Sequence, residues 1–128
     1  MVSQATGVII ATPEYHGGFS SITKLVIENP GFPSMLGGKP IALLGVAAGQ
    51  IGAMKSLDAL RGVYSHIGGI VLPGPVSKAG VQQKCNSDGK CLDSATETLL
   101  MGLARALTDY IKGSICPSIA LERMVRQV

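Results

Sequence analysis

The segment Gly7–Gly18, with the sequence GVIIATPEYHGG, decides the fold. Its apolar run has no polar alternation, which is typical of a strand buried on both faces of a parallel α/β sheet. The run ends in a turn at the carboxyl end of the strand, the place where open α/β sheets bind ligands. Because Pro13 has no amide proton, we expect the backbone to leave the sheet there. On pattern alone the turn is equally an ordinary strand-to-helix connection.

The same unit of strand, small-residue loop and helix recurs along the chain. Residues 41–46, IALLGV, predict a second buried strand, the loop 47–52 follows it, and residues 53–66 have helical periodicity. A third short strand is expected at 70–72. Between the first two strands, Ser20 or Ser21 would cap a helix to about Glu28 whose buried stripe holds Ile22, Leu25 and Val26. The order predicts parallel units that bring the two loops together as two edges of one slot.

The last third of the sequence predicts a loop and one long helix. Residues from about 76 to 90 have no periodic pattern and contain an Asn-Ser-Asp-Gly turn. A capping box at Ser94–Glu97 would start a helix to about Lys112, with an inward stripe of Leu99, Leu103, Ala106, Leu107 and Tyr110. Gly113 and Pro117 would end the domain at residue 113. They would leave a tail, 114–128, in which a short amphipathic helix would carry Leu121, Met124, Val125 and Val128.

Composition narrows the class of protein. The 128 residues suit one domain, and 46% hydrophobic with 15% charged residues indicate a compact α/β core. The formal charge of +3 is scattered, so we expect neither a nucleic-acid nor a membrane partner. Three cysteines, an odd number, favour free thiols in a reducing compartment, and we expect a cytoplasmic protein.

The residues Thr12–Gly17, TPEYHG, resemble the T-P-E-Y-x-G loop of the NADPH-dependent FMN reductase family. This resemblance implies a flavodoxin-like three-layer α/β sandwich with a parallel sheet, in which the loop lies along the edge of the flavin ring. It implies FMN as cofactor and NADPH or NADH as electron donor. A quinone, azo compound, metal oxyanion or free flavin would be the small-molecule electron acceptor, and the enzyme would be a homodimer or homotetramer.

The resemblance also implies which residues bind the cofactor. A second family loop, rich in small residues, matches the segment after the second strand. The implied flavin-binding residues are Thr12, Pro13, Glu14, Tyr15, His16, Gly17, Gly18, Ala48, Gly49, Gln50 and Gly52.

The resemblance does not extend to the N-terminal residues of the sequence. Family members begin with a strand and a G-S-x-R-x-x-S loop that holds the flavin phosphate, and Met1–Thr6 match neither. We therefore expect a fold that is incomplete at its N-terminal end, with an apolar edge strand that leads to aggregation or binds a partner. The alternative function is a non-catalytic remnant or interaction module, and a more distant one is a different doubly wound protein that binds another small ligand.

Other reactive side chains give weaker signals. His16 could act as a general acid, but we favour a loop residue because flavin chemistry belongs to the cofactor. We assign no catalytic side chain. Cys85 and Cys91 flank a turn and could form a redox disulfide, although free thiols are the favoured interpretation, and no spacing indicates a metal site.

Overall fold

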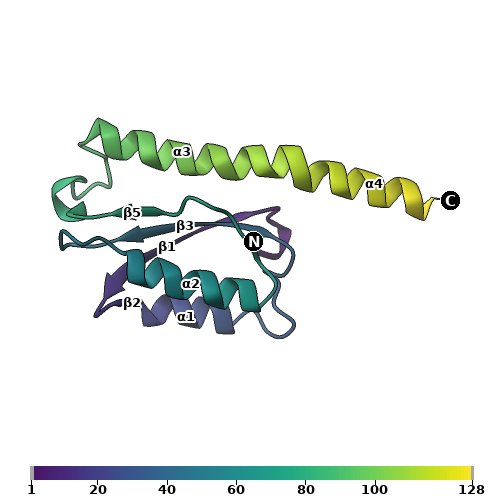
Figure 1. The fold of residues 1–128 in the computed structure, drawn as a ribbon, viewed down its shortest axis with the longest axis horizontal. Coiled ribbons are helices and arrows are strands. Elements are labelled where there is room, and N and C mark those ends of the chain that lie inside the picture. The colour runs from purple at the N-terminus through teal and green to yellow at the C-terminus, as the bar shows by residue number, and fades with distance from the viewer. Residues whose placement is uncertain (1, 128) are drawn as a thin grey trace.

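A computed structural model of the chain describes residues 2–127. Figure 1 shows a sheet with α1 and α2 on one face and α3 on the other, so the protein has three layers. The elements, in chain order, are η1 (Val2–Gln4), β1 (Val8–Tyr15), β2 (Gly18–Phe19), α1 (Ser21–Glu28), β3 (Pro40–Val46), α2 (Met54–His66), β4 (Ile70–Val71), β5 (Val76–Lys78), η2 (Val81–Gln83), α3 (Ser94–Tyr110), η3 (Ile111–Ile115) and α4 (Cys116–Arg126).

The sheet is mostly parallel, as predicted. Its order is β2-β1-β3-β4, and β1 pairs with β3 in parallel from Val8 opposite Ile41 to Pro13 opposite Val46. Two short strands pair with β3: β4 with the first residues of β3 and β5 with its last residues. They therefore follow one another along the same edge of β3. The prediction of an unstructured loop over 76–90 was therefore wrong for β5 and for η2.

Two apolar clusters hold the layers together. Under α1 and α2, the buried side chains of β3 contact the helices, and this cluster consists of Ile27, Leu36, Ile41, Leu43, Leu57, Leu60 and Tyr64. Under α3, the opposite face of the sheet supplies Ala42, which packs with Leu72, Leu103 and Leu107. The uninterrupted apolar run of β3 follows from burial on both faces.

The expectation that the chain leaves the sheet at Pro13 was wrong. β1 continues to Tyr15 and then turns back antiparallel into β2. A residue without an amide proton is tolerated because Pro13 is paired on one side only, to β3, among the residues that the structure describes. Ile9 and Ala11, earlier in β1, are exposed, which agrees with the predicted apolar edge strand.

Helix α1 has the predicted position and cap but not the predicted buried face. The Ser20 side chain accepts a hydrogen bond from the Thr23 amide at the start of the helix. Thr23 and Ile27 face the core, whereas Ile22, Leu25 and Val26 are 72%, 55% and 46% exposed. The apolar stripe of α1 thus lies on the surface.

The C-terminal helices differ from the prediction at both ends. Asp93, not Ser94, caps α3, because its carboxylate accepts from the Thr96 amide at 3.2 Å. Within the predicted stripe, Leu103 and Leu107 are buried, Tyr110 is half-buried, and Leu99 and Ala106 are exposed. The boundary at residue 113 stays a prediction.

Helix α3 continues through the π-helical turn η3 into α4, and Figure 1 shows one rod that extends beyond the sheet. The wider turn precedes Pro117, whose ring would otherwise clash with a carbonyl of the preceding turn. In α4, Leu121, Met124 and Val125 are exposed, and Val128 lies outside the described residues. Over residues 2–127, no helix combines the length and apolar character needed to cross a membrane.

Candidate functional site

The first predicted loop is a tight β-hairpin turn. Tyr15 pairs with Gly18, and the two residues between them have positive φ, 51° for His16 and 77° for Gly17. Positive φ at both central positions is typical of a type I′ turn, the two-residue turn that matches the twist of a hairpin. Glycine adopts this conformation readily, whereas His16 is the one non-glycine residue of the described chain with positive φ.

The second predicted loop follows β3 and is fixed at both ends. The Ala47 amide donates to the Lys78 carbonyl at 2.9 Å, and the Ala53 amide donates to Ser77 Oγ at 2.8 Å. Gly52 has a φ of 78°, and a Cβ there would lie 2.6 Å from Ser77 Oγ, so only glycine fits. Within residues 2–127, none of the four consecutive amides of Ala48–Ile51 has a hydrogen-bond acceptor, and Gly52 closes a turn that begins at Gly49. These amides are free to donate to a ligand.

The two loops border one cavity of about 310 Å³, which confirms their predicted proximity. It lies at the carboxyl ends of β1 and β3, where parallel sheets bind ligands. Its lining is Glu14, His16, Gly17, Ala47, Ala48, Gly49, Gln50, Ile51 and Gly52. Ala47 and Ile51 were not among the predicted residues, and their signal was their position inside the same small-residue segment.

The Glu14 side chain joins the hairpin to helix α2. Its Oε2 accepts from the Ser56 amide at 3.2 Å and from the Ser56 hydroxyl at 3.3 Å. Ser56 lies in the first turn of α2, where amides lack acceptors within the helix and a negative charge is favourable. The carboxylate therefore holds the cavity wall in place.

Four predicted residues do not line the cavity. Thr12 is buried, and its hydroxyl oxygen accepts from the Ser20 amide at 3.2 Å and from the Thr23 hydroxyl at 3.1 Å. Pro13 is part of the β1–β3 pairing, Gly18 is part of β2, and the Tyr15 side chain is exposed. The structure thus gives Thr12 a role in positioning α1.

The titratable groups with clearly shifted pKa values lie outside the cavity. Burial raises the pKa of Tyr64, in the core under α2, to about 12. At the start of α3, the hydrogen bond from the Thr96 hydroxyl, with help from Lys84 and Lys78, lowers the pKa of Asp93. Among residues 2–127 there is no group of three or more His, Cys, Asp or Glu side chains placed to hold a metal ion.

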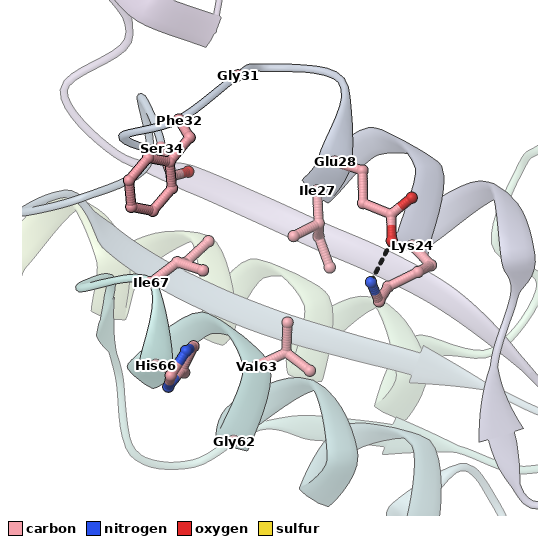
Figure 2. Close-up of a pocket in the computed structure, with 10 residues that line it drawn as sticks. All are labelled: Lys24, Ile27, Glu28, Gly31, Phe32, Ser34, Gly62, Val63, His66 and Ile67. Carbon is pink, nitrogen blue, oxygen red and sulfur yellow. Dashed lines mark hydrogen bonds and ion pairs between the residues drawn. The ribbon is translucent and has the colours of Figure 1, made fainter.

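A larger cavity, of about 810 Å³, lies between α1, the segment after it and the end of α2. Figure 2 shows Ile27, Val63 and Ile67 along it, with Phe32 beside it. Its charged groups Lys24 and Glu28 are exposed and paired with each other. A mostly apolar groove with a self-paired ion pair suits a partner surface, so the smaller cavity, with its free amides, is the candidate site for a polar cofactor.

Comparison with known proteins identifies the family. The profile of the family described as NADPH-dependent FMN reductase matches residues 1–83 of the 128. A 2-hydroxy-1,4-benzoquinone reductase of Burkholderia sp. is 31% identical over 77 residues, 58% of this chain and 42% of that protein. A quinone reductase of Escherichia coli (strain K12) is 30% identical over 117 residues, 87% of this chain and 61% of that protein.

A solved structure agrees with these relatives. FerB of Paracoccus denitrificans, a flavoenzyme NAD(P)H:(acceptor) oxidoreductase, superposes with a TM-score of 0.72 at 26% identity, over 88% of this chain and 64% of that one. This likeness confirms the predicted flavodoxin-like fold. The chain spans 42% and 61% of the lengths of the two curated relatives. It belongs to the NADPH-dependent FMN reductase family.

Proposed function

We propose that this protein is an FMN-dependent NAD(P)H oxidoreductase that reduces a small acceptor. The observation that supports this most directly is the row of free amides in Ala48–Ile51, on a loop that borders the same cavity as the hairpin turn. A flavin ring presents ring nitrogens and carbonyl oxygens along one edge, and backbone amides are suitable donors to them. FMN, when bound, supplies the electron transfer between the nicotinamide nucleotide and the acceptor.

The residues proposed to contact the ring are those predicted residues that line the cavity. The amides of Ala48, Gly49 and Gln50 would donate to its polar edge, Gly52 would line the cavity beside them, and His16 and Gly17 would form the opposite wall. Glu14 would act through its backbone, because Ser56 engages its carboxylate. Among residues 2–127, no Lys or Arg lines this cavity, so it fits the ring rather than the phosphate.

A lining without Lys or Arg among the described residues also favours the alternative function, a flavodoxin-like interaction module without bound flavin. A titration of the purified chain with FMN, followed by flavin fluorescence, separates the two proposals. Saturable quenching followed by NAD(P)H oxidation with a quinone supports the reductase. A folded chain that leaves FMN fluorescence unchanged supports the module. Quinones are the acceptors to test first, because both curated relatives are named for quinone reduction.

A matched pair of glycine variants tests the location of the site. A Cβ at Gly49 or at Gly102 would meet no other atom within 4 Å, so G49A and G102A should both fold. Only Gly49 lines the cavity, and a methyl group that intrudes on the ligand costs about 1–3 kcal/mol. We expect G49A to weaken FMN binding roughly five- to hundredfold and G102A to leave it unchanged. Equal affinities would place the flavin elsewhere.

We further propose that the protein is a homo-oligomer, a dimer or tetramer, in the cytoplasm. The exposed stripe of Ile22, Leu25 and Val26 lies on α1, and the large apolar groove adjoins the same helix. Phe32, which is fully exposed at that groove, could bury its ring in a second copy. The odd number of cysteines favours a reducing compartment, and cell fractionation tests the location.

A further inference from the structure

Two cysteines face each other across the hairpin that precedes α3. Cys85 and Cys91 are antiparallel bridge partners. The flanking hydrogen bonds run from the Asn86 amide to the Lys90 carbonyl, 3.0 Å, and from the Leu92 amide to the Lys84 carbonyl, 2.7 Å. This pattern makes the cysteines a non-hydrogen-bonded pair, whose Cα atoms are about 4.5 Å apart and whose side chains are close. A disulfide spans Cα separations of roughly 4.4–6.8 Å, so the pair is within bonding range.

The hairpin is held at its tip and at its base. At the tip, Asn86 Oδ1 accepts from the Asp88 amide at 3.1 Å and from the Lys90 amide at 2.8 Å, and Gly89 has the positive φ of a hairpin loop. At the base, the Asp93 carboxylate caps α3 and lies 3.5 Å from Lys84 Nζ. The two sulfur atoms are therefore held opposite each other before any bond forms.

The two thiols have different surroundings, and we use this difference to assign which of them reacts first. Both cysteines are half-buried and free, and the Cys91 thiol donates to the Asp93 carbonyl at 3.3 Å. Burial and the neighbouring Cys91 raise the pKa of Cys85, so Cys85 has a smaller thiolate fraction at neutral pH than an ordinary cysteine. We assign the first attack on an oxidant to Cys91 and the resolving step to Cys85.

We propose that Cys85 and Cys91 form a reversible redox site, a dithiol that hydrogen peroxide converts to an intramolecular disulfide. The Cys91 thiolate attacks one peroxide oxygen, the O–O bond breaks, and hydroxide leaves, so that Cys91 becomes a sulfenic acid. The Cys85 sulfur then attacks the Cys91 sulfur, the S–O bond breaks, and water leaves with the Cys85 proton. In sum, two thiols lose two electrons and one peroxide becomes two waters. A thiol reductant restores the dithiol and is itself oxidised to a disulfide.

This site does not depend on the proposed flavin chemistry, and its test uses no activity assay. The full-length chain is treated with hydrogen peroxide, its remaining thiols are alkylated, and trypsin is added. Cleavage after Lys84 and Lys90 places the cysteines on the separate peptides 85–90 and 91–105. Mass spectrometry should find these two peptides joined and the alkylated thiol count reduced from three to one. Dithiothreitol should restore all three.

Serine variants and an unfolded control complete the experiment. C116S, at the exposed cysteine of α4, should form the same disulfide, whereas C85S and C91S should not. Because the fold holds the thiols together, Cys85 should attack the Cys91 sulfenic acid about tenfold faster in the folded chain than in urea, so dimedone should trap less sulfenic acid in the folded chain. The proposal is overturned if peptides 85–90 and 91–105 stay unlinked after peroxide is consumed. It is equally overturned if Cys116 is found linked to either cysteine as often, or if dimedone traps as much sulfenic acid in the folded chain as in urea.

Discussion

Replacing Thr12 with valine should destabilise the fold without changing the affinity of the folded protein for FMN. The Thr12 side chain is 1% exposed, and valine has nearly the same shape without the hydroxyl. The Ser20 amide would lose its hydrogen-bond acceptor, which costs about 1–3 kcal/mol for a buried group. The Thr23 hydroxyl would lose less, at most about 1 kcal/mol, because Ser20 Oγ remains 2.9 Å away.

The methyl group that replaces the hydroxyl returns about 0.8 kcal/mol by burial. We therefore expect T12V to lower the free energy of unfolding by about 1–3 kcal/mol, which corresponds to a fall in Tm of roughly 5–15 °C for a domain of this size. Urea denaturation followed by circular dichroism measures the change. T12S, which keeps the hydroxyl, should lose less, and T98V, at an exposed threonine of α3, should stay within about 0.5 kcal/mol of the natural chain.

The outcome distinguishes the structural role of Thr12 from the flavin contact that the sequence predicted. At a temperature where T12V is folded, its FMN affinity should agree with the natural value within about twofold. A T12V chain as stable as the natural one would refute the hydrogen-bond argument. Weaker FMN binding by a stable T12V chain would instead indicate that Thr12 contacts the flavin, as the sequence predicted.

Three further predictions concern groups away from the cavity. Ionised Asp93 stabilises the fold above the ordinary Asp pKa of about 3.9, and this contribution disappears as pH falls through the lowered folded-state pKa. D93N should therefore reduce Tm at neutral pH, with a difference from the natural chain that narrows in acid. The Tyr64 hydroxyl is buried without a partner among the described residues, and its pKa is about 12. The natural chain should lose stability between about pH 10 and 12, as the unfolded state ionises, and Y64F should lose less while being at least as stable at neutral pH. If the chain forms the proposed oligomer through α1, L25K should shift it toward monomer in sedimentation velocity, whereas T98K, at an exposed site of α3, should not.

The sequence predicted those parts of the fold that local pattern determines. The apolar runs of β1 and β3 identify parallel strands, and α2 begins and ends near the glycines Gly52 and Gly68. Only β3 is buried on both faces, because β1 lies at the sheet edge with Ile9 and Ala11 exposed. β5 was missed because a three-residue strand after a Pro-Gly-Pro segment has no periodicity of its own. It forms because the last residues of β3 offer unpaired backbone groups beside it.

Helix α1 shows why periodicity did not give the buried face. Its pattern contains a clear apolar stripe, but the hydrogen bonds among Thr12, Ser20 and Thr23 set the rotation of the helix about its axis. They turn Thr23 toward the sheet and leave Leu25 outside. A polar contact between residues far apart in sequence is invisible to a pattern of hydrophobic residues, and it outweighed that pattern here.

At the candidate site, the motif predicted the two loops but not how their side chains are used. Thr12 and Glu14 look like ligand-binding groups in the sequence, because a hydroxyl and a carboxylate follow a buried strand. In the structure each reaches the first turn of a different helix, Thr12 at α1 and Glu14 at α2. The sequence contains no signal that separates a side chain directed at a ligand from one directed at a helix N-terminus.

These contacts explain why the amides of the second loop remain available. Glu14 satisfies the first turn of α2 and Ser77 the Ala53 amide just before it, so the residues of Ala48–Gly52 need not fold back to do so. Side chains thus fix the two helix starts, and the loop that lines the cavity keeps unpaired amides. It follows that substitutions of Thr12, Glu14 or Ser77 should act mainly on stability. Ligand affinity should respond to changes that displace the loop backbone or fill the space beside it, as at Gly49.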